Sequence, residues 1–542
     1  MAVCGIVLAN VLAQFTVLRI DLTADRRYTL SPDTKQLLRN LSGDTEVTLY
    51  LNGSFNSGFT RLSRSAVQLL NEMKAYTDLS ISLVNPNKLS DSDRQALVAS
   101  LARHNLHPTA IYETTGNGSR SETLVYPFAL VRYQGREQFV SLLENRRDLS
   151  GAENLNHSAE SLEYKFALCL RTLQNPERHR ILFLEGQGEL PEQNTKDVES
   201  LLAEHFDIYR GALNSHSDCL NPFSAVIVAD PQTPFSEADK YVLDQYIMQG
   251  GSVLWLVNGV QFSEQVLEDE GFTPALALDL NLTDMLFRYG VRINNHLLQD
   301  LQCLSIPVDV SRNPDQPQWQ PMPWTYAPLL LTSNISPITA NLSPVSATFC
   351  SDLSSVGDNP DLQSTILLAS SDHATLIPVP GEVDLGDLNH DPRLFTLAYL
   401  PVAVSLDGIF PSVFEHRMIP ESIEQHGEKL AQSCPARQIV VASGSVISND
   451  LQQGQPLPAG YDRYSRIQFA NRDFILNSVL WLTDYSDLLP LRQKIIPLRL
   501  LNKNRLNSGI ALPVSLSLIL PLLILALTGI IVQLVRKHKY TL

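Results

Sequence analysis

The chain has 542 residues and a formal net charge of −16. This length suggests roughly two to four domains, and the acidic balance argues against a nucleic-acid-binding protein, which would carry a basic face. The sequence contains neither a C-x-x-C motif nor a Cys/His cluster, so we expect no zinc site, no dithiol redox centre and no bound metal or cofactor. One or two disulfides could still form among the five cysteines that follow the first apolar segment, which are Cys169, Cys219, Cys303, Cys350 and Cys434.

The first apolar segment covers residues 1–18 and reads MAVCGIVLANVLAQFTVL. A secretory signal peptide is one interpretation, but such a peptide begins with basic residues and ends at a small-residue cleavage site. No basic residue precedes this run, and no A-x-A site follows it. We therefore predict an uncleaved transmembrane anchor over 1–18. Within 19–43 we predict a membrane-proximal helix that Ser31 caps and Pro32 begins.

Residues 44–175 have the pattern of a small α/β domain, because helical periodicity alternates with short apolar strands. A Gly-Asn-Gly sequence at 116–118 indicates a hairpin turn. The order of elements is somewhat thioredoxin-like, but the paired cysteines of a redox domain are absent, so the similarity would be one of fold only. Strands are predicted at 47–51, 79–84, 123–133 and 138–143, with a further one at Ile111, and helices at 62–76, 91–104 and 156–173.

Residues 178–490 are predicted to form a doubly wound, flavodoxin-like domain. Uninterrupted apolar strands alternate with helices, which is typical of a parallel sheet covered on both faces. The part from about 261 to 423 reads as an insertion of short strands and long loops, because the prolines within 313–324 argue against a central strand. Strands are predicted at 181–184, 225–229, 252–257 and 437–443, and helices at 197–205, 236–248 and 471–482.

The second apolar segment lies within 508–535, and its stretch from Ile510 to Val535 contains no charged residue. About 20 apolar residues cross the hydrocarbon core of a bilayer, so we predict a transmembrane helix with a basic cap that starts at Arg536. A buried core helix is the alternative, but core helices rarely run this long without charge. Counting basic residues near both spans would place the large segment in the cytoplasm. Long domains translocate largely regardless of charge, so the sequence leaves the orientation open.

Polar side chains follow the first and second predicted strands of the doubly wound domain. The turn Gly186-x-Gly188 resembles the start of a dinucleotide loop, but Pro191 occupies the place of the third glycine, and a tight strand-to-helix turn explains it better. Ligands of open α/β sheets bind at the carboxyl ends of strands. A solvated rim is the alternative to a ligand-binding crevice here, whose candidate residues are Glu185, Gly186, Gln187, Gly188, Glu189 and Asp230.

Catalytic chemistry of the amidotransferase or hydrolase kind needs an activated nucleophile at a strand-to-helix elbow. Cys169 lies in a predicted helix and Cys219 in a polar loop. Ser443-Gly444-Ser445 does follow a strand, but its flanking residues do not complete G-x-S-x-G, so we expect an ordinary turn. No catalytic residue is predicted, and the chain lacks the G-x-x-x-x-G-K-[ST] loop that cradles phosphates in P-loop ATPases.

Five stretches in fixed order are distinctive. They are DLTADRRYTLSPDTKQLL after the first apolar segment, FLEGQGE at 183–189, VADPQTPFSEADKYVLDQYIMQGGSVLWLVN at 228–258, WTYAPLL at 324–330 with SPITANLSPV at 336–345, and NRDFILNSVLWL at 471–482. Together they resemble the gliding-motility-associated ABC-transporter auxiliary proteins, once called substrate-binding components. Members usually have His inside the glycine turn, where this chain has Gln187, and that departure lowers any case for chemistry there.

The resemblance implies a non-enzymatic auxiliary subunit of an ABC-type complex in the bacterial inner membrane. It further implies a periplasmic body, a separate ATPase and a multi-span permease as partners, and a middle domain similar to amidotransferase-like folds without their nucleophile. A stand-alone receptor for a peptide or glycan, a protein-binding scaffold and a hydrolase are the alternatives. Helix packing in the bilayer uses small residues, of which the last span and its approach offer Ser508, Gly509, Ala511, Ala526 and Gly529.

Overall fold

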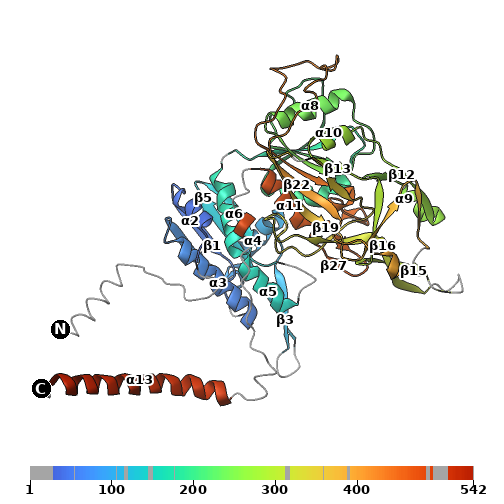
Figure 1. Ribbon diagram of the computed structural model, residues 1–542. Helices are drawn as coiled ribbons and strands as arrows, with labels where there is room; N and C mark the ends of the chain where they lie inside the picture. Colours follow the sequence, from blue (N-terminus) through green and yellow to red (C-terminus); the bar gives the residue numbers. More distant parts are fainter. Residues whose placement is uncertain are drawn as a thin grey trace. The chain divides into compact units, whose positions relative to one another are not determined.

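A computed structural model describes most of the chain between residues 29 and 540 (Figure 1). The predicted anchor over 1–18 lies outside the described residues. Contacts divide the chain into a large body that ends at Ile495 and a C-terminal unit that begins at Ile496. The gaps in the description are positions 54, 105, 115–119, 145–149, 176, 310, 312–317, 358, 387–390, 484–488 and 492–510.

The body begins with helix α2 (Pro32–Arg39), and the sequence prediction of its start is confirmed. The Ser31 hydroxyl accepts a hydrogen bond from the Thr34 N–H at 3.0 Å, and Pro32 supplies the first helical residue. Leu37 and Leu38 are buried, so this short helix is held by packing of its apolar face.

A four-stranded sheet follows, in the order β2-β1-β5-β6. Strands β1 and β2 are parallel and joined through α3, while β5 and β6 form an antiparallel hairpin. The elements of this part are β1 (Thr45–Leu49), α3 (Ser57–Met73), β2 (Leu79–Leu83), α4 (Asp91–Arg103), β3 (Thr109–Thr114), β4 (Arg120–Val125), β5 (Phe128–Tyr133), β6 (Arg136–Ser141), α5 (Gly151–Glu160) and α6 (Leu162–Gln174).

One detail of this part differs from the sequence prediction, and one predicted turn lies outside the described residues. The single helix predicted over 156–173 is two helices, α5 and α6, which are separated at Ser161. The Ser161 hydroxyl donates to the Ser158 carbonyl at 3.2 Å, the kind of local bond by which serine competes with a continuous helix. Strands β3 and β4 pair as an antiparallel hairpin, but the predicted turn at 116–118 lies outside the described residues.

The larger sheet has ten strands, and five of them form a continuous parallel array in the order β8-β7-β9-β10-β23. All residues of β9 and β10 are buried, as expected for central strands covered on both faces. The elements of this array are β7 (Arg180–Glu185), α7 (Glu192–Leu202), β8 (Asp207–Ala212), β9 (Ala225–Ala229), α8 (Glu237–Met248), β10 (Ser252–Leu256), β23 (Ala436–Val441) and α11 (Asn471–Leu482).

The helices cover the two faces of this array for a topological reason. The crossover β7-α7-β8 and the crossover β9-α8-β10 run in opposite directions across the sheet, and parallel crossovers are right-handed. Therefore α7 and α8 lie on opposite faces. Helix α11 packs against α7, β10 and β23, so it completes the face that α7 covers.

The part predicted as an insertion of short strands and long loops supplies strands to the same sheet, a pairing that the sequence analysis did not predict. Beyond β23 the order continues through β22, β19, β16 and β15, all antiparallel to their neighbours. The sheet therefore changes from parallel to antiparallel at β23. The added strands are β15 (Cys303–Asp309), β16 (Trp319–Thr332), β17 (Val345–Ser346), β19 (Leu362–Ala369) and β22 (Pro401–Gly408).

The prolines within 313–324 argue against a central strand, and from Trp319 onward this stretch belongs to β16. The prolines are accommodated because this half of β16 pairs with β15 alone, and its pairing with β19 is confined to Leu331 and Thr332. Pro321 and Pro323 alternate along the strand, so their missing N–H groups share one side, which the ladder leaves free at an edge. The rest of the stretch, at 312–317, lies outside the described residues.

Small sheets accompany the antiparallel half. One has three strands, β11–β12–β21, and two have two strands each, β13–β18 and β14–β20. These elements are β11 (Val260–Gln261), α9 (Glu264–Glu270), β12 (Phe272–Ala277), α10 (Thr283–Arg288), β13 (Val291–Ile293), β14 (His296–Asp300), β18 (Leu353–Ser355), β20 (Ala374–Pro378) and β21 (Gly381–Asp384). Two short hairpins, β24–β25 (Leu451–Gln452, Gln455–Pro456) and β26–β27 (Tyr461–Asp462, Ile467–Gln468), precede α11.

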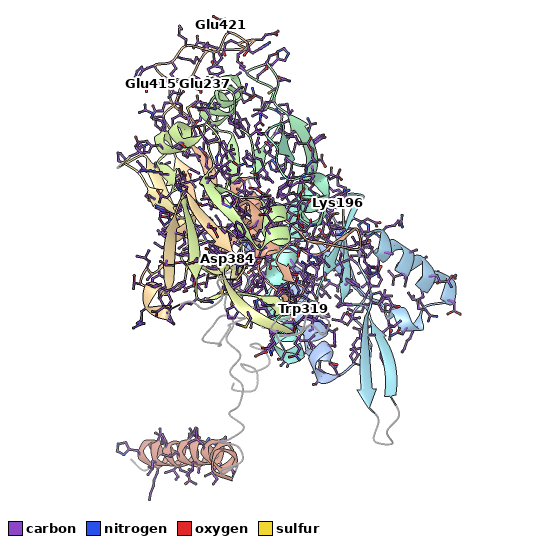
Figure 2. All side chains as sticks on the ribbon, turned by 90° about the vertical axis from the view of Figure 1, so that its right-hand side faces the viewer. Lys196, Glu237, Trp319, Asp384, Glu415 and Glu421 are labelled. Carbon is purple, nitrogen blue, oxygen red and sulfur yellow. The ribbon has the colours of Figure 1, made fainter. Side chains whose placement is uncertain are left out.

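Residues 409–435, which connect β22 to β23, form a long loop over α8. The buried Asp244 carboxylate on α8 accepts hydrogen bonds from the Ser412 hydroxyl at 2.7 Å, the Val413 N–H at 2.9 Å and the Tyr289 hydroxyl at 2.8 Å. The Arg417 guanidinium of the loop lies 3.8 Å from the carboxylate of Glu237, which is labelled in Figure 2 and lies at the start of α8. The 409–435 loop is therefore fixed to the helix beneath it.

The C-terminal unit contains helix α13 (Ala511–Tyr540). Within it, Ile519–His538 is the one helical stretch among the described residues that is long and apolar enough to cross a membrane, and none of it is buried inside the protein. Two spans were predicted from the sequence; the described residues contain one candidate. The expected basic cap is part of this helix, which continues through Arg536 and Lys537.

A pH dependence of stability follows from His205, a buried residue after α7. Burial, with a smaller contribution from the Arg178 guanidinium, lowers the pKa of its imidazole from 6.5 to about 4. As the pH falls below about 6.5, the unfolded chain binds a proton that the folded chain does not, so stability decreases. We expect a loss of about 2 kcal/mol between about pH 7 and about pH 5, which His205→Phe should remove.

Guanidinium unfolding of the full chain in detergent, followed by circular dichroism at both pH values, measures this difference. His373→Phe is the matched control, because His373 is exposed. An unchanged pH dependence in His205→Phe would contradict the assignment.

Candidate functional site

The six residues predicted to form a crevice lie in two connected turns at the carboxyl ends of β7 and β9. Gly186 and Gly188 have positive φ values of 125° and 75°, which explains the glycines at these places. The Gln187 carbonyl between them accepts hydrogen bonds from the Gln232 N–H at 2.8 Å and the Thr233 N–H at 2.9 Å. A Cβ at Gly188 would lie 3.2 Å from the Gln232 Cβ. The glycine turn is therefore packed against the segment that follows β9.

The charges of this turn disfavour an anionic ligand. Glu189 accepts the Gln187 N–H at 2.8 Å, and burial raises the pKa of its carboxyl although backbone hydrogen bonds oppose the shift. The Glu185 carboxylate pairs with the Arg210 guanidinium at 2.6 Å, and Arg210 also pairs with Glu199 at 2.6 Å. The nearby cation is thus shared between two carboxylates. This arrangement supports the interpretation of the segment as a structural turn rather than as a pyrophosphate-binding loop.

Asp230 ties together the ends of three parallel strands. It has a φ of 56°, and its carboxylate accepts a hydrogen bond from the Asn258 side-chain amide at 2.6 Å. The Asn258 side-chain carbonyl in turn accepts the Gly444 N–H at 2.9 Å. Because Asp230 follows β9, Asn258 follows β10 and Gly444 follows β23, this chain of bonds closes the carboxyl edge of the sheet at these strands.

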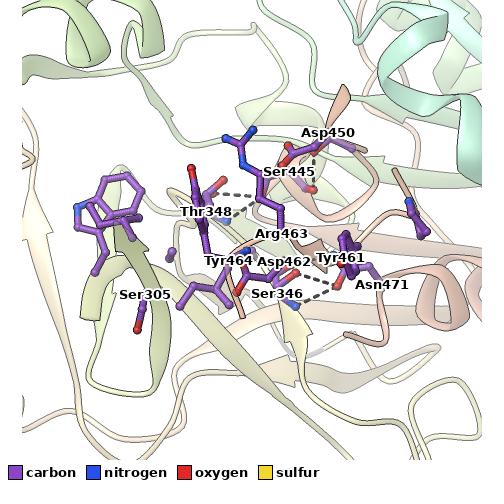
Figure 3. Close-up of a pocket in the computed structure, with 18 residues that line it drawn as sticks. Ser305, Ser346, Thr348, Ser445, Asp450, Tyr461, Asp462, Arg463, Tyr464 and Asn471 are labelled. Atoms are coloured by element: carbon purple, nitrogen blue, oxygen red, sulfur yellow. Dashed lines mark hydrogen bonds between the residues drawn. The ribbon is translucent and has the colours of Figure 1, made fainter. Parts of the chain in front are cut away.

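A cavity of about 190 Å³ lies beside this edge, next to β15–β17 and the start of α11 (Figure 3). None of the six predicted crevice residues lines it. The cavity is smaller than the roughly 300 Å³ at which drug-sized ligand sites begin, so it suits a small group such as one side chain or one ring. Its lining residues are Leu304, Ser305, Ile306, Trp324, Ala327, Ser346, Ala347, Thr348, Ser445, Ser448, Asp450, Pro458, Gly460, Tyr461, Asp462, Arg463, Tyr464 and Asn471.

Several polar groups of the cavity wall are already engaged by the fold. The Asn471 side-chain carbonyl accepts the Ser346 N–H at 3.0 Å, and its amide donates to the Ser346 carbonyl at 2.8 Å. Trp324 is an exception: its indole N–H is buried and has no acceptor among the described residues. Buried donors without a partner are unusual in proteins, and this one has almost no accessible surface, so the indole ring rather than its N–H faces the cavity.

Ser445, the serine of the turn after β23, is bonded to other hydroxyls and to backbone. Its hydroxyl accepts the Thr348 N–H at 2.8 Å, lies 3.2 Å from the Thr348 carbonyl and 2.9 Å from the Ser443 hydroxyl. These partners hold it in place and none of them is a general base. This supports the sequence interpretation of an ordinary turn.

The thiols of the described residues are free, so the disulfides that the sequence left open do not form among them. Burial raises the pKa of four thiols above the usual value, to about 11 in Cys303 and about 12 in Cys350, and in the same direction in Cys169 and Cys219. A raised pKa disfavours the thiolate, which is the reactive form.

The cavity was missed in the sequence because its wall comes from segments far apart in the chain. Ser305 and Trp324 belong to the antiparallel extension, whereas Ser445 and Tyr461 come more than a hundred residues later. The sequence offered one usable signal, the WTYAPLL motif that contains Trp324.

Substituting Gly444 tests the closed edge of the sheet. A Cβ at this position would collide with the Asp230 carboxylate, so Gly444→Ala should destabilise the body by roughly 1–3 kcal/mol. Gly151→Ala is the control, because a Cβ at Gly151 meets nothing within 4 Å. Chemical unfolding of both variants measures the effect; equal stability of the two would show that the Asp230 contact is loose.

Comparisons with known proteins add the following. No curated protein matches this chain. Among solved structures, the mmIFT52 N-terminal domain is 16% identical and covers 56% of this chain and 96% of its own, with a TM-score of 0.31, which is too low to carry an argument. Residues 24–132 match the model of a domain of unknown function. Residues 178–478, more than half of the chain, match the model of a family described as an ABC-type uncharacterized transport system, and the protein therefore belongs to this ABC-transporter auxiliary family.

Proposed function

We propose that the protein is a non-enzymatic, membrane-anchored auxiliary subunit of an ABC-type transport complex. Membership of the auxiliary family supports a transport-associated role, and it is the observation that carries the proposal. Helix α13 supports attachment to the lipid bilayer, since Ile519–His538 has the length and composition of a span. The narrower assignment to gliding-motility-type complexes rests on the sequence resemblance alone and is part of the proposal.

The proposed partners are a separate ATPase and a multi-span permease. An ABC-type transporter needs ATP hydrolysis, and this sequence lacks the Gly-rich loop with Lys and Ser/Thr that would cradle the phosphates. The energy-converting step therefore requires another chain. One or two helices do not enclose a transport pathway, which is the reason to propose a permease as well.

We place the large body on the periplasmic side of the inner membrane and the basic end of α13 in the cytoplasm. Arg536, Lys537 and Lys539 follow the apolar stretch, and basic residues favour the cytoplasmic side. The basic residues between the body and the span argue in the opposite direction, but long domains translocate largely regardless of charge. An anchor over 1–18 would return the chain to the same side, so two spans fit this topology.

The absence of catalysis is also part of the proposal. It is supported by the raised thiol pKa values and by the partners of Ser445, which include no base. The body would then act through binding surfaces alone, which makes its contacts with partner chains the property to measure.

The first experiment is a detergent pull-down of the full chain with mass spectrometry of everything retained. We expect stoichiometric recovery of a Walker-motif ATPase and a multi-span protein. Gly529 and Ala526 lie three residues apart on α13 and share one face, where small residues permit close helix packing. Gly529→Leu should therefore reduce recovery of the permease about tenfold, which corresponds to roughly 1.4 kcal/mol.

Ile531→Leu is the matched control, because position 531 lies roughly 200° around the helix from Gly529 and the exchange keeps the side-chain volume. Recovery of the chain alone, under conditions that preserve other ABC complexes, would contradict the transporter assignment. Unchanged recovery with Gly529→Leu would contradict only the packing face. Ser508 and Gly509 lie outside the described residues, as does the side chain of Ala511, so this face is argued from Ala526 and Gly529.

A receptor for a peptide or glycan is the second candidate function, and the cavity next to Trp324 favours it. A ligand that binds only the folded body raises its melting temperature. We expect at least one member of a panel of short peptides and glycans to do so, and Trp324→Phe, which changes the aromatic ring that lines the cavity, to reduce that shift by more than half. A panel without any stabilising member would contradict this function and leave the transporter assignment untouched.

A further inference from the structure

Three side chains of metal-ligating types, with Asp218 nearby, meet on the surface where two distant loops run side by side. His216 and Asp218 belong to the loop between β8 and β9, and Glu424 and His426 belong to the 409–435 loop. The candidate ligand atoms of His216, Glu424 and His426 all lie within 4.8 Å of one another. The sequence analysis expected no metal site because the chain has no C-x-x-C motif and no Cys/His cluster along the sequence. His216 and Glu424 are brought together only by the fold.

The backbone holds the two loops together independently of any ion. His216 and Glu424 form a parallel bridge, in which the Ser217 N–H donates to the Glu424 carbonyl at 3.2 Å and the Glu424 N–H donates to the Ser215 carbonyl at 2.7 Å. The buried Ser217 hydroxyl accepts the His426 N–H at 2.8 Å. The ligand-bearing residues are therefore positioned by hydrogen bonds between the loops rather than by chance proximity of flexible side chains.

Alternation along the loop places the ligands on one face. Glu424 and His426 are two residues apart, and successive side chains of an extended segment point to opposite sides. Gln425 between them points inward, since its side-chain carbonyl accepts the Tyr241 hydroxyl of α8 at 2.7 Å. Glu424 and His426 are thus left on the outer face, next to the exposed ring of His216.

The distances are close to those of a tetrahedral site. Ligand bonds of about 2.0–2.1 Å place neighbouring ligand atoms roughly 3.3–3.4 Å apart. The His216 Nδ1 and a Glu424 carboxylate oxygen are 3.2 Å apart, and the His426 Nδ1 and an Asp218 carboxylate oxygen are 4.0 Å apart. The candidate ligand atoms of His216, Glu424 and His426 lie within 4.8 Å of one another, so rotation of these exposed side chains must bring them to the spacing of a bound ion. Two imidazoles with carboxylates suit Zn²⁺ and similar transition-metal ions, whereas Ca²⁺ and Mg²⁺ prefer oxygen ligands only.

We propose that His216, Glu424 and His426 bind a divalent transition-metal ion such as Zn²⁺. The ion joins the β8–β9 loop to the 409–435 loop and so strengthens the cover over α8. Three protein ligands leave the fourth position to water or to the nearby Asp218, whose carboxylate lies 4.0 Å from the His426 Nδ1. The site is separate from the cavity lined by Trp324, and it does not depend on the proposed transport role.

Equilibrium dialysis against Zn²⁺ tests the site, with the chelator-stripped full chain in detergent, free of a polyhistidine tag, and metal counted by elemental analysis. We expect about one Zn²⁺ per chain. His216→Ala and His426→Ala should each weaken binding by more than the roughly 10–100-fold that follows loss of an outer-shell partner. His416→Ala is the control, because His416 is an exposed histidine of the same loop. Cys434→Ser controls for the exposed thiol.

A second readout examines the link between the loops. Zn²⁺ should slow proteolysis within the 409–435 loop of the wild-type chain and leave the rate in His216→Ala unchanged. Circular dichroism confirms that each variant is folded. Binding that survives both His216→Ala and His426→Ala, disappears in Cys434→Ser, or is absent from the wild-type chain would overturn the proposal. Zn²⁺ binding without any effect on proteolysis would overturn the joining role.

Discussion

The need to cover a parallel sheet on both faces determines most of this body. Strands β9 and β10 are buried along their whole length, so neither face of the array can be left to solvent. On one face, α7 and α11 pack against each other. On the other, α8 is itself covered by the 409–435 loop, and the buried Asp244 carboxylate fixes that loop from below. Without the loop, the Asp244 carboxylate would lose its hydrogen bonds from Ser412 and Val413 and keep the one from Tyr289.

The carboxyl edge of the array is also largely covered. In many open α/β sheets this edge is a ligand crevice. Here the chain of hydrogen bonds from Asp230 through Asn258 to Gly444 closes it at the central strands, and the glycine turn after β7 is packed against the segment that follows β9. The open volume lies instead towards the antiparallel extension, beside Trp324. A binding function of this body would therefore use the added strands more than the parallel array.

These features fit a subunit that acts through contacts. The chain belongs to an ABC-transporter auxiliary family and carries one candidate span among its described residues. Burial raises the pKa of four of its thiols, and the partners of the turn serine Ser445 include no base. Two long loops that meet over α8 provide a surface with a defined shape and with side chains suited to a metal ion. A transporter partner would recognise such a surface only if the 409–435 loop is held in one conformation, which is what its many bonds to α8 provide.

The sequence by itself determined the local elements. The cap at Ser31, the buried strands over 225–229 and 252–256, the helix that Ser236 caps and the apolar C-terminal helix are all marked by local periodicity and capping residues, and they agree with the structure. Tertiary structure decided how distant segments pair. It placed the proline-containing strand at an edge of the ladder, turned the predicted insertion into the antiparallel half of the sheet, and brought His216 next to Glu424. Strand neighbours and loop contacts depend on packing between segments that are far apart in the chain. A local pattern of residues does not specify which distant segments pair.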